Sequence, residues 1–322
     1  MDYERLAMEL VRALRGQRSQ VAWSRRLGYR SNVAASWEHG RRWPTAAETF
    51  RASARTGVDV RAAWARFFAD VPPDWLARLD PTTTRGVAAL LDEVRANTPI
   101  VELAERTGIS RYAISRWLSG KTEPRLPDFL RLFEVASTRL LDLLSAIVEM
   151  ESLPSVMQLW QRIEARRNGA ATHPWTQAIL RALELEAYLG LPAHEPGWIA
   201  RHLGISEVEE TRCLAFLKDT DQVRWTGTRY EGRTLAVDLR SRPTISRALK
   251  AHWTREGAAR IEGGAPGQFS YLCFSVSRED MERIREHHLR YFNTLRSIIS
   301  ESTPNEVVCV ANIQLFGLES DA

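Results

Sequence analysis

The chain has 322 residues, of which 44% are hydrophobic and 26% are charged, and its formal net charge is +4. This composition excludes a disordered chain, which needs low hydrophobicity, and a collagen-like chain, which needs periodic glycine. It also excludes the run of about 20 apolar residues that spans a membrane. A soluble globular protein of two or three domains is expected. Because a small net charge can conceal a basic surface that acidic residues balance elsewhere, the distribution of charge along the chain matters.

The N-terminus and the cysteines indicate the cellular setting. The sequence begins Met1-Asp2-Tyr3-Glu4, which is acidic and lacks the basic start and apolar core of a secretory signal. We therefore expect a cytoplasmic protein. Cys213, Cys273 and Cys309 form no CxxC pair and have apolar neighbours, so buried free thiols are expected rather than a metal or redox site.

A repeat with a shift of 80 residues organises the N-terminal half. Its landmarks are two glycines, a tryptophan and a proline, which recur without a gap: Gly28, Trp37, Gly40 and Pro44, then Gly108, Trp117, Gly120 and Pro124. In each copy a short helix, at 19–27 or 98–107, is expected to end at a glycine that can adopt positive φ. A second helix is expected to begin near Ser31 or Ser110, whose hydroxyl can cap it. The pattern is helix, turn, helix, loop, helix.

Positive charge is concentrated on these two segments. Residues 15–42 contain seven arginines and one acid, a net charge of +6, and residues 106–125 contain five basic residues and one acid, a net charge of +4. The rest of the chain therefore carries a net charge of −6. Such clustering is expected of a surface that binds the phosphates of nucleic acid.

Both copies resemble the repressor/Cro-like helix-turn-helix family of bacterial and phage regulators. The first matches the family pattern at Gln20, Gly28, Trp37-Glu38, Gly40 and Pro44, and the second at Leu103-Ala104, Gly108, Ile114-Ser115, Trp117, Gly120 and Pro124. The resemblance implies that the second helix of each copy enters the major groove, where its first residues contact base edges and the flanking loop holds phosphates. Ile100 is a departure, because the family often has there the glutamine that matches Gln20.

The resemblance also implies which side chains contact DNA. Base contacts would come from Ser31, Asn32 and Ser36 in the first copy and from Arg111, Tyr112 and Arg116 in the second. Backbone contacts would come from Gln20, Arg30, His39, Arg41 and Arg42 in the first copy and from Ser119 and Lys121 in the second. Paired modules in one chain would span two half-sites about 34 Å apart. The alternative is that the landmarks only maintain small helical domains, with Arg111 and Arg116 as solvated helix residues.

Four domains and one linker are expected along the chain. They are a first helix-turn-helix domain at 1–80, a second at 81–150, a helical linker at 151–174, a winged-helix domain at 175–240 and a small α+β domain at 241–322. Turns at 71–74 and 81–84 bracket a short linking helix. An apolar helix is expected at 140–150, a polar one at 163–168, and a flexible boundary at 169–174.

The winged-helix prediction depends on the order of elements after residue 175. A helix and turn at 198–206 and a helix at 207–219 precede strands at 223–226 and 234–239. The helix at 207–219 is acidic, because Glu207, Glu209, Glu210 and Asp219 outnumber Arg212 and Lys218. A structural or dimer-forming role is therefore favoured over a nucleic-acid role through the arginines of the wing.

The C-terminal segment is expected to be a small mixed sheet covered by a helix, from strands at 269–276 and 307–316 and a helix at 278–300. Its ending, Asn312-Ile313-Gln314-Leu315-Phe316 behind a winged helix, resembles a domain-of-unknown-function family attached to helix-turn-helix segments in bacterial regulator-like proteins. The resemblance covers roughly residue 175 to the end. The fold class expected for the whole chain is mainly α, with two tandem five-helix-type helix-turn-helix domains, a winged helix and a small α+β C-terminal domain.

These patterns favour a cytoplasmic bacterial transcription regulator that binds a double-stranded DNA operator. Its C-terminal half would form a homodimer, sense an effector or recruit a protein partner. HExxH, GxSxG, Walker and GxGxxG patterns do not occur, so no enzyme, catalytic residue, cofactor or metal site is expected. One alternative is an adaptor whose helical modules bind a protein or peptide. Another is an RNA-binding regulator, which would depend on stacking aromatics such as Tyr112 and Trp225.

Overall fold

The computed structural model describes residues 1–68, 72–233 and 237–318 and divides into two compact units. The first unit comprises 1–164 and 238–243, and the second comprises the described residues of 165–237 and 244–322. Each unit has a hydrophobic core of its own. Within the described ranges, no helix is both long enough and apolar enough to cross a membrane.

The first repeat is a group of five helices between residues 3 and 68. They are α1 (Tyr3–Arg15), α2 (Gln20–Arg26), α3 (Val33–Glu38), α4 (Ala46–Thr56) and α5 (Val60–Phe68). Local sequence signals fix their ends: α2 begins at Ser19, whose side chain accepts a hydrogen bond from Ala22 N, and α4 begins with a capping box of Thr45 and Glu48. Trp23 and Trp37 are buried between the helices and meet edge to face, with ring centroids 6.0 Å apart.

The second repeat has the same order of helices between residues 84 and 145. They are α7 (Thr84–Arg95), α8 (Ile100–Thr107), α9 (Arg111–Leu118), α10 (Leu126–Ser137) and α11 (Leu140–Ser145). The expected linking helix is present as α6 (Trp75–Arg78), although residue 71 of the turn before it lies outside the described residues. The helix expected at 140–150 is shorter than predicted, because α11 ends at Ser145 and a 3-10 helix, η1 (Met150–Ser152), follows.

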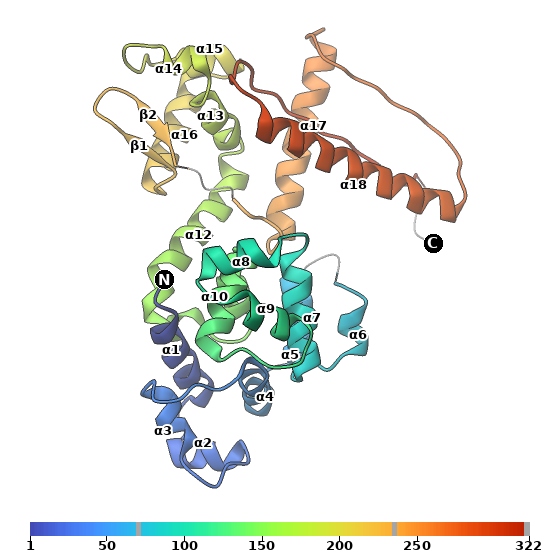
Figure 1. The fold of residues 1–322 in the computed structure, drawn as a ribbon. Coiled ribbons are helices and arrows are strands. Elements are labelled where there is room, and N and C mark those ends of the chain that lie inside the picture. The colour runs from blue at the N-terminus through green and yellow to red at the C-terminus, as the bar shows by residue number, and fades with distance from the viewer. Residues whose placement is uncertain (69–71, 234–236, 319–322) are drawn as a thin grey trace. The chain divides into compact units, whose positions relative to one another are not determined.

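The two repeats pack against each other around one shared core (Figure 1). An antiparallel bridge joins Thr45 to Arg125, with Ala46 N donating to Pro124 O (3.1 Å) and Leu126 N donating to Pro44 O (2.9 Å). These donors and acceptors correspond at the 80-residue shift. Helix α1 packs on α10, and the corresponding pair α7 and α4 also packs. Equivalent segments that exchange equivalent bonds are related by a local twofold axis, so the repeats form a pseudo-symmetric pair.

Helix α12 (Pro154–Thr172) corrects the predicted flexible boundary. Residues 169–172 form its last turn, and the division between the two units falls earlier, after Glu164. Gly169 is needed there for packing rather than for flexibility, since a Cβ at this position would lie 1.8 Å from the Phe216 ring. Composition alone does not separate these two uses of glycine.

The second unit begins with short helices and a hairpin. They are α13 (Thr176–Ala182), α14 (Glu186–Leu189), α15 (Trp198–Leu203), α16 (Glu207–Asp219), β1 (Val223–Trp225) and β2 (Tyr230–Gly232). The strands are antiparallel, and Val223 lies opposite Gly232. The return strand was expected at 234–239 and is found at 230–232 instead. Residues 234–236 lie outside the described residues, and 237–239 form no strand.

The C-terminal segment contains two long helices, α17 (Pro243–Glu262), which the sequence analysis missed, and α18 (Arg278–Glu301), which it predicted. The predicted strands at 269–276 and 307–316 are wrong, and so is the small α+β domain, because both segments are extended without strand pairing. A β-prone segment becomes a strand only when a neighbour supplies its hydrogen bonds. No described segment does so here.

The missing sheet leaves the C-terminal side chains exposed. Tyr271 is 96% exposed and Leu272 is 80% exposed, and neither α17 nor α18 has a buried residue. Cys273 and Cys309 are exposed as well, so the expectation of buried thiols holds only for Cys213. Burial beside Glu209 raises the pKa of the Cys213 thiol to about 12.

Candidate nucleic-acid interface

Helices α8 and α9 of the second repeat meet at the tight turn expected from the sequence. Gly108, which has φ +71°, is the C-cap of α8, and Ser110 is the N-cap of α9, where its Oγ accepts a hydrogen bond from Ala113 N (3.2 Å). Leu103 and Ile114 are fully buried where the two helices pack. This packing fixes which side of α9 faces inward and which faces solvent.

The outer face of α9 carries the side chains that were predicted to read bases. Arg111, Tyr112 and Arg116 are all exposed, and Tyr112 is 73% exposed. Ser115 is exposed on the same face, one turn after Arg111, and the sequence analysis did not include it. The spacing of four residues from Arg111 was the available signal. The structure therefore brings the second repeat's predicted base-reading set together on one helix face.

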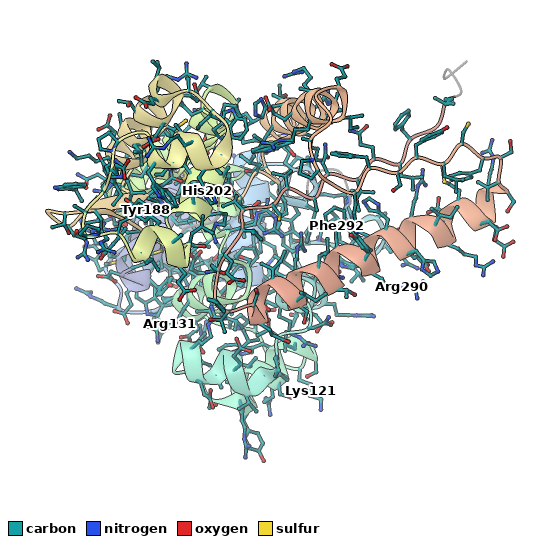
Figure 2. All side chains as sticks on the ribbon, turned by 90° about the horizontal axis from the view of Figure 1, so that it is seen from above. Lys121, Arg131, Tyr188, His202, Arg290 and Phe292 are labelled. Carbon is teal, nitrogen blue, oxygen red and sulfur yellow. The ribbon has the colours of Figure 1, made fainter. Side chains whose placement is uncertain are left out.

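The loop after α9 carries the predicted backbone contacts of this repeat. Ser119 and Lys121 are exposed, and Lys121 N donates to Arg116 O (2.9 Å), which closes the loop onto the helix end. Figure 2 labels Lys121 at the surface of this repeat. The loop thus presents one ammonium group beside the C-terminal end of α9.

In the first repeat the recognition-type helix is shorter. Helix α3 begins at Val33 with Asn32 as its N-cap, whereas Ser31 had been expected to cap it. Asn32 Oδ1 accepts hydrogen bonds from Ala35 N and from Ser24 Oγ, each at 3.3 Å. The amide oxygen is therefore engaged in holding the turn. Ser31 is exposed and Ser36 is half-buried, so the polar face of α3 offers only short side chains.

A buried carboxylate holds the first repeat together. Glu38 is 3% exposed and forms an ion pair with Arg15 at 2.5 Å, while Gln20 Nε2 donates to Glu38 Oε2 at 2.9 Å. Arg12 Nη2 donates to the carbonyl of Glu38 (2.9 Å). The amide of Gln20 is thus oriented at the start of α2. In the second repeat the equivalent positions are Leu118 for Glu38 and Ile100 for Gln20, so the cluster has no counterpart there.

Most of the predicted backbone contacts carry free positive charge. Among the described residues, these exposed cations form no ion pair: Arg30, Arg41, Arg42, Arg111, Arg116 and Lys121. Other basic residues of the same segments are already engaged, since Arg15 pairs with Glu38 and Arg106 pairs with Glu102 at 3.2 Å. The exposed His39 donates from Nδ1 to Ala35 O (2.7 Å). The six include every arginine and lysine assigned to DNA contact, and Arg18 and Arg25 are further exposed cations of the first repeat without an ion pair to any described residue.

Comparison with known families matches two segments of the chain. Residues 91–142 match a helix-turn-helix family of the Cro/C1-like type, which is typical of DNA-binding regulators. Residues 157–318, half of the chain, match the family described as a domain of unknown function, DUF4423. The chain belongs to the DUF4423 family. No curated protein and no solved structure matches it.

The DUF4423 segment uses one of its acidic residues internally. Glu210 of α16 is 2% exposed and accepts hydrogen bonds from Gly197 N (3.3 Å) and Ala200 N (2.6 Å), at the start of α15. Its position in the acidic helix is therefore explained by packing of α16 on α15. His194 lies 3.9 Å from the same carboxylate, and burial lowers the pKa of its imidazole.

The hairpin arginines of the DUF4423 segment are all engaged. Arg224 pairs with Glu231 across the strands at 2.7 Å, Arg233 pairs with Asp221, and Arg229 donates to the carbonyl of Leu191 (2.9 Å). None of them is a free cation comparable to those of the two repeats. The arrangement favours a structural role for this hairpin over DNA contact.

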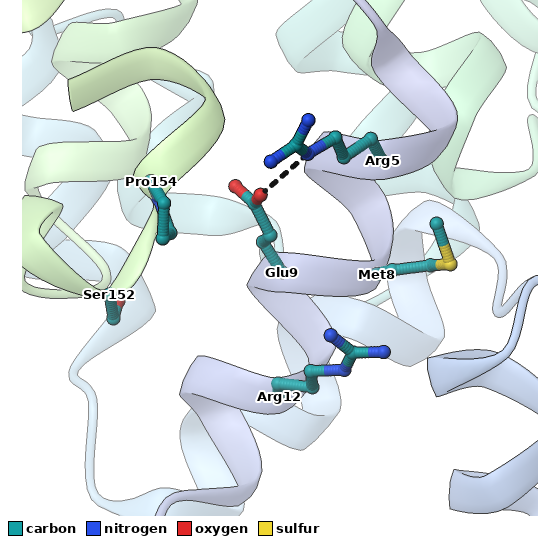
Figure 3. A pocket seen from close by; sticks show the side chains of 6 residues that line it. All are labelled: Arg5, Met8, Glu9, Arg12, Ser152 and Pro154. Carbon is teal, nitrogen blue, oxygen red and sulfur yellow. Dashed lines mark hydrogen bonds and ion pairs between the residues drawn. The ribbon is translucent and has the colours of Figure 1, made fainter. Parts of the chain in front are cut away.

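In a pocket of about 470 Å³ in the first unit, the charged side chains of the wall form hydrogen bonds or ion pairs with other groups of the protein. Its walls include Arg5, Glu9 and Arg12, and Figure 3 shows the ion pair between Arg5 and Glu9, at 3.2 Å. Glu9 also accepts from Ser155 N (3.0 Å) and Ser155 Oγ (2.6 Å), at the start of α12. Glu9 therefore ties α1 to α12.

Proposed function

We propose that this protein is a sequence-specific DNA-binding transcriptional regulator of bacterial type that acts through recognition helices in the major groove. The observation that carries the proposal is the outer face of α9, in a segment that matches the helix-turn-helix family. Arg111 and Arg116 lie free on that face, one on the first turn and one on the second. Their guanidinium groups suit bidentate hydrogen bonds to guanine O6 and N7.

In this proposal Arg111, Tyr112 and Arg116 read bases from the second repeat. The ring of Tyr112 supplies an apolar contact for a thymine methyl group, and its hydroxyl supplies a donor. Ser119 and Lys121 hold the adjacent phosphates. The start of a recognition helix is the part that meets base edges, which suits the position of Arg111 as the first residue of α9.

The first repeat is proposed to act mainly on the sugar-phosphate backbone. Arg30, Arg41 and Arg42 lie just before and just after α3, and together with Gln20 and His39 they form its backbone-contacting set. Ser31, Asn32 and Ser36 are the candidates for base contact. Because the Asn32 oxygen is used by the cap, its amide nitrogen is the group left for a base acceptor.

The second unit is proposed to be a winged helix of structural or dimer-forming role, outside the DNA interface. The internal use of Glu210 and the engaged hairpin arginines support this assignment. Helix α18 places Phe292 and Arg290 on different sides (Figure 2), and none of its residues is buried. Its exposed apolar side chains support a homodimer, in which a second copy would cover them. The proposal includes a cytoplasmic location, no catalytic activity, and an effector or protein partner at this half.

The alternative is an adaptor that binds a protein or peptide and keeps the helix-turn-helix repeats as scaffold. One observation favours it: large apolar side chains are exposed along 269–276 and 307–316. The free cations of the repeats favour DNA instead. The two functions differ in whether the chain prefers one DNA sequence.

Titration of the full chain against the DNA upstream of its own gene, at several salt concentrations, tests the proposal. A scrambled duplex of equal length is the matched control. We expect a preference of at least about 10³-fold, and a slope of log affinity against log salt near −4 from the phosphate contacts of Arg30, Arg41, Arg42 and Lys121. Equal micromolar affinity for the two duplexes would contradict sequence-specific regulation. The absence of DNA binding at low salt would favour the adaptor function.

A further inference from the structure

The pseudo-twofold relation of the repeats extends beyond the bridge at Thr45 and Arg125. Arg131 of α10 lies over the Tyr3 ring at the start of α1, 5.7 Å from its centroid. The equivalent residue, Arg51 of α4, donates to Thr82 O (3.1 Å), just before the start of α7. Each fourth helix therefore uses an arginine at the same position to reach the first helix of the other repeat. The pairing is fixed at two independent places.

This pairing limits the distance between the two recognition helices. Helix α3 ends at Glu38, seven residues before the bridge residue Thr45. Helix α9 ends at Leu118, seven residues before the bridge residue Arg125. Seven residues span at most about 25 Å and bridged residues lie about 5 Å apart, so the two helix ends lie within about 55 Å. Half-sites one DNA turn apart, about 34–36 Å, fit this limit, whereas a spacing of two turns does not.

The two recognition helices carry unlike side chains at equivalent positions. Arg111 and Arg116 of the second repeat correspond to Ser31 and Ser36 of the first, and exposed Tyr112 corresponds to the capping residue Asn32. Two arginines select guanine strongly, while serines contact any base with little preference. The free cations Arg41 and Arg42 flank the helix with serines, so its interaction is dominated by phosphates.

We propose that one chain occupies one DNA site built of two unlike half-sites, one helical turn apart. The half under the second repeat contains guanines read by Arg111 and Arg116, and the half under the first repeat is permissive in sequence and held by its phosphates. This inference rests on the proposed function, since it describes the DNA that the same surface takes. A regulator with one module per chain needs two identical chains for two half-sites, whereas here the second module is covalently attached.

Selection of bound duplexes from a random DNA library by the full chain, followed by hydroxyl-radical footprinting, tests the inference. We expect an asymmetric motif with specified guanines on one side, a footprint that covers two backbone segments one turn apart, and one chain per motif. That ratio is one whether or not the C-terminal halves associate. The double variant Arg111→Ala/Arg116→Ala should lower the preference for the guanine half at least about tenfold.

The double variant Arg61→Ala/Arg66→Ala, which removes two exposed arginines of α5 outside the proposed DNA-contacting set, is the matched control and should leave the selected motif unchanged. Arg41→Ala/Arg42→Ala should weaken protection of the permissive half alone. A palindrome of two half-sites in which each half-site is bound by a different chain, or protection of a single half-site, overturns the inference while the proposed function stands. Failure to select any motif overturns both. Circular dichroism of each variant shows that these surface changes leave the helices intact.

Discussion

The two repeats share a framework and differ in what they present on it. In both, a glycine ends the first helix of the turn, a tryptophan anchors the second, and a proline precedes the bridge. In the first repeat the buried Glu38 orients the side chain of Gln20. The second repeat has Leu118 at the position of Glu38, and its recognition-type helix exposes Arg111 and Arg116. The comparison teaches that the landmark residues set the positions of helices, and that the exposed positions between them diverge freely.

The largest expected effect tests whether the repeats are one cooperative unit. Trp117→Ala and Trp37→Ala each remove a buried ring, of 9% and 6% exposure, and should cost about 3–5 kcal/mol. Because the repeats share one core, hydrogen exchange should speed up in peptides of both repeats for either variant. Faster exchange confined to the repeat that carries the substitution would show that the two fold independently.

The next largest effect concerns the buried Glu38 cluster, which only the first repeat contains. Glu38→Leu installs the residue of the second repeat, removes the partner of Arg15 and Gln20, and should cost about 2–3 kcal/mol of unfolding free energy. The value is below that of a fully buried pair because Arg15 retains 22% exposure. Glu102→Leu, whose pair with Arg106 is half exposed, is the control and should cost less than about 0.5 kcal/mol in urea titrations. Equal losses in the two variants would contradict the role of the cluster.

The helices of the N-terminal half could be predicted from the sequence, because glycine, tryptophan and proline each impose a local constraint. The N-cap at Asn32 could not be chosen over Ser31, because both side chains cap helices and only packing around Ser24 decides. The strands at 269–276 and 307–316 were predicted from propensity, which says nothing of whether a pairing partner is near. The sequence gives the number of arginines and acidic residues in 207–233. Which of these side chains pair with each other or with the backbone depends on the fold, as for Glu210 and Arg233.

Base readout by the second repeat is tested by single substitutions at equivalent positions. Arg116→Ala should relax the preference at one base pair, at a cost of about 1–3 kcal/mol in binding, because a bidentate contact to guanine is lost. Ser36→Ala in the first repeat should change binding much less. Competition titrations with duplexes altered at single base pairs measure both. A uniform loss for all duplexes in Arg116→Ala would assign this arginine to the phosphates.

A phosphate contact of the first repeat gives a smaller and sequence-independent effect. Arg41→Ala should weaken binding to every duplex and reduce the magnitude of the salt slope by about 1, because one phosphate contact is removed. Arg66→Ala on α5, whose guanidinium donates to Ala146 O, is the control and should leave the slope unchanged. An unchanged slope in Arg41→Ala would place that side chain outside the interface.

A further difference between the repeats is a pH dependence of stability in the first repeat. Burial and the hydrogen bond to Glu48 (2.7 Å) raise the pKa of Tyr29 to about 12, and the equivalent residue in the second repeat is Ile109. The folded chain therefore holds this proton more tightly than the unfolded chain, so stability is present below pH 10 and falls as pH rises toward 12. Tyr29→Phe should show a smaller loss of unfolding midpoint over that range. Identical losses in variant and wild type would exclude Tyr29 as the source.

The bridge between Thr45 and Arg125 has a consequence for orientation. A symmetric dimer sits on its palindrome equally well when turned end for end, so the complex has no direction along the double helix. In the proposed complex, two unlike modules in one chain would remove that ambiguity for each bound chain, because the turned-round complex would place the arginines over the wrong half. A single chain bound in this way would point in one direction along the DNA. It would therefore distinguish a gene on one side of the site from a gene on the other.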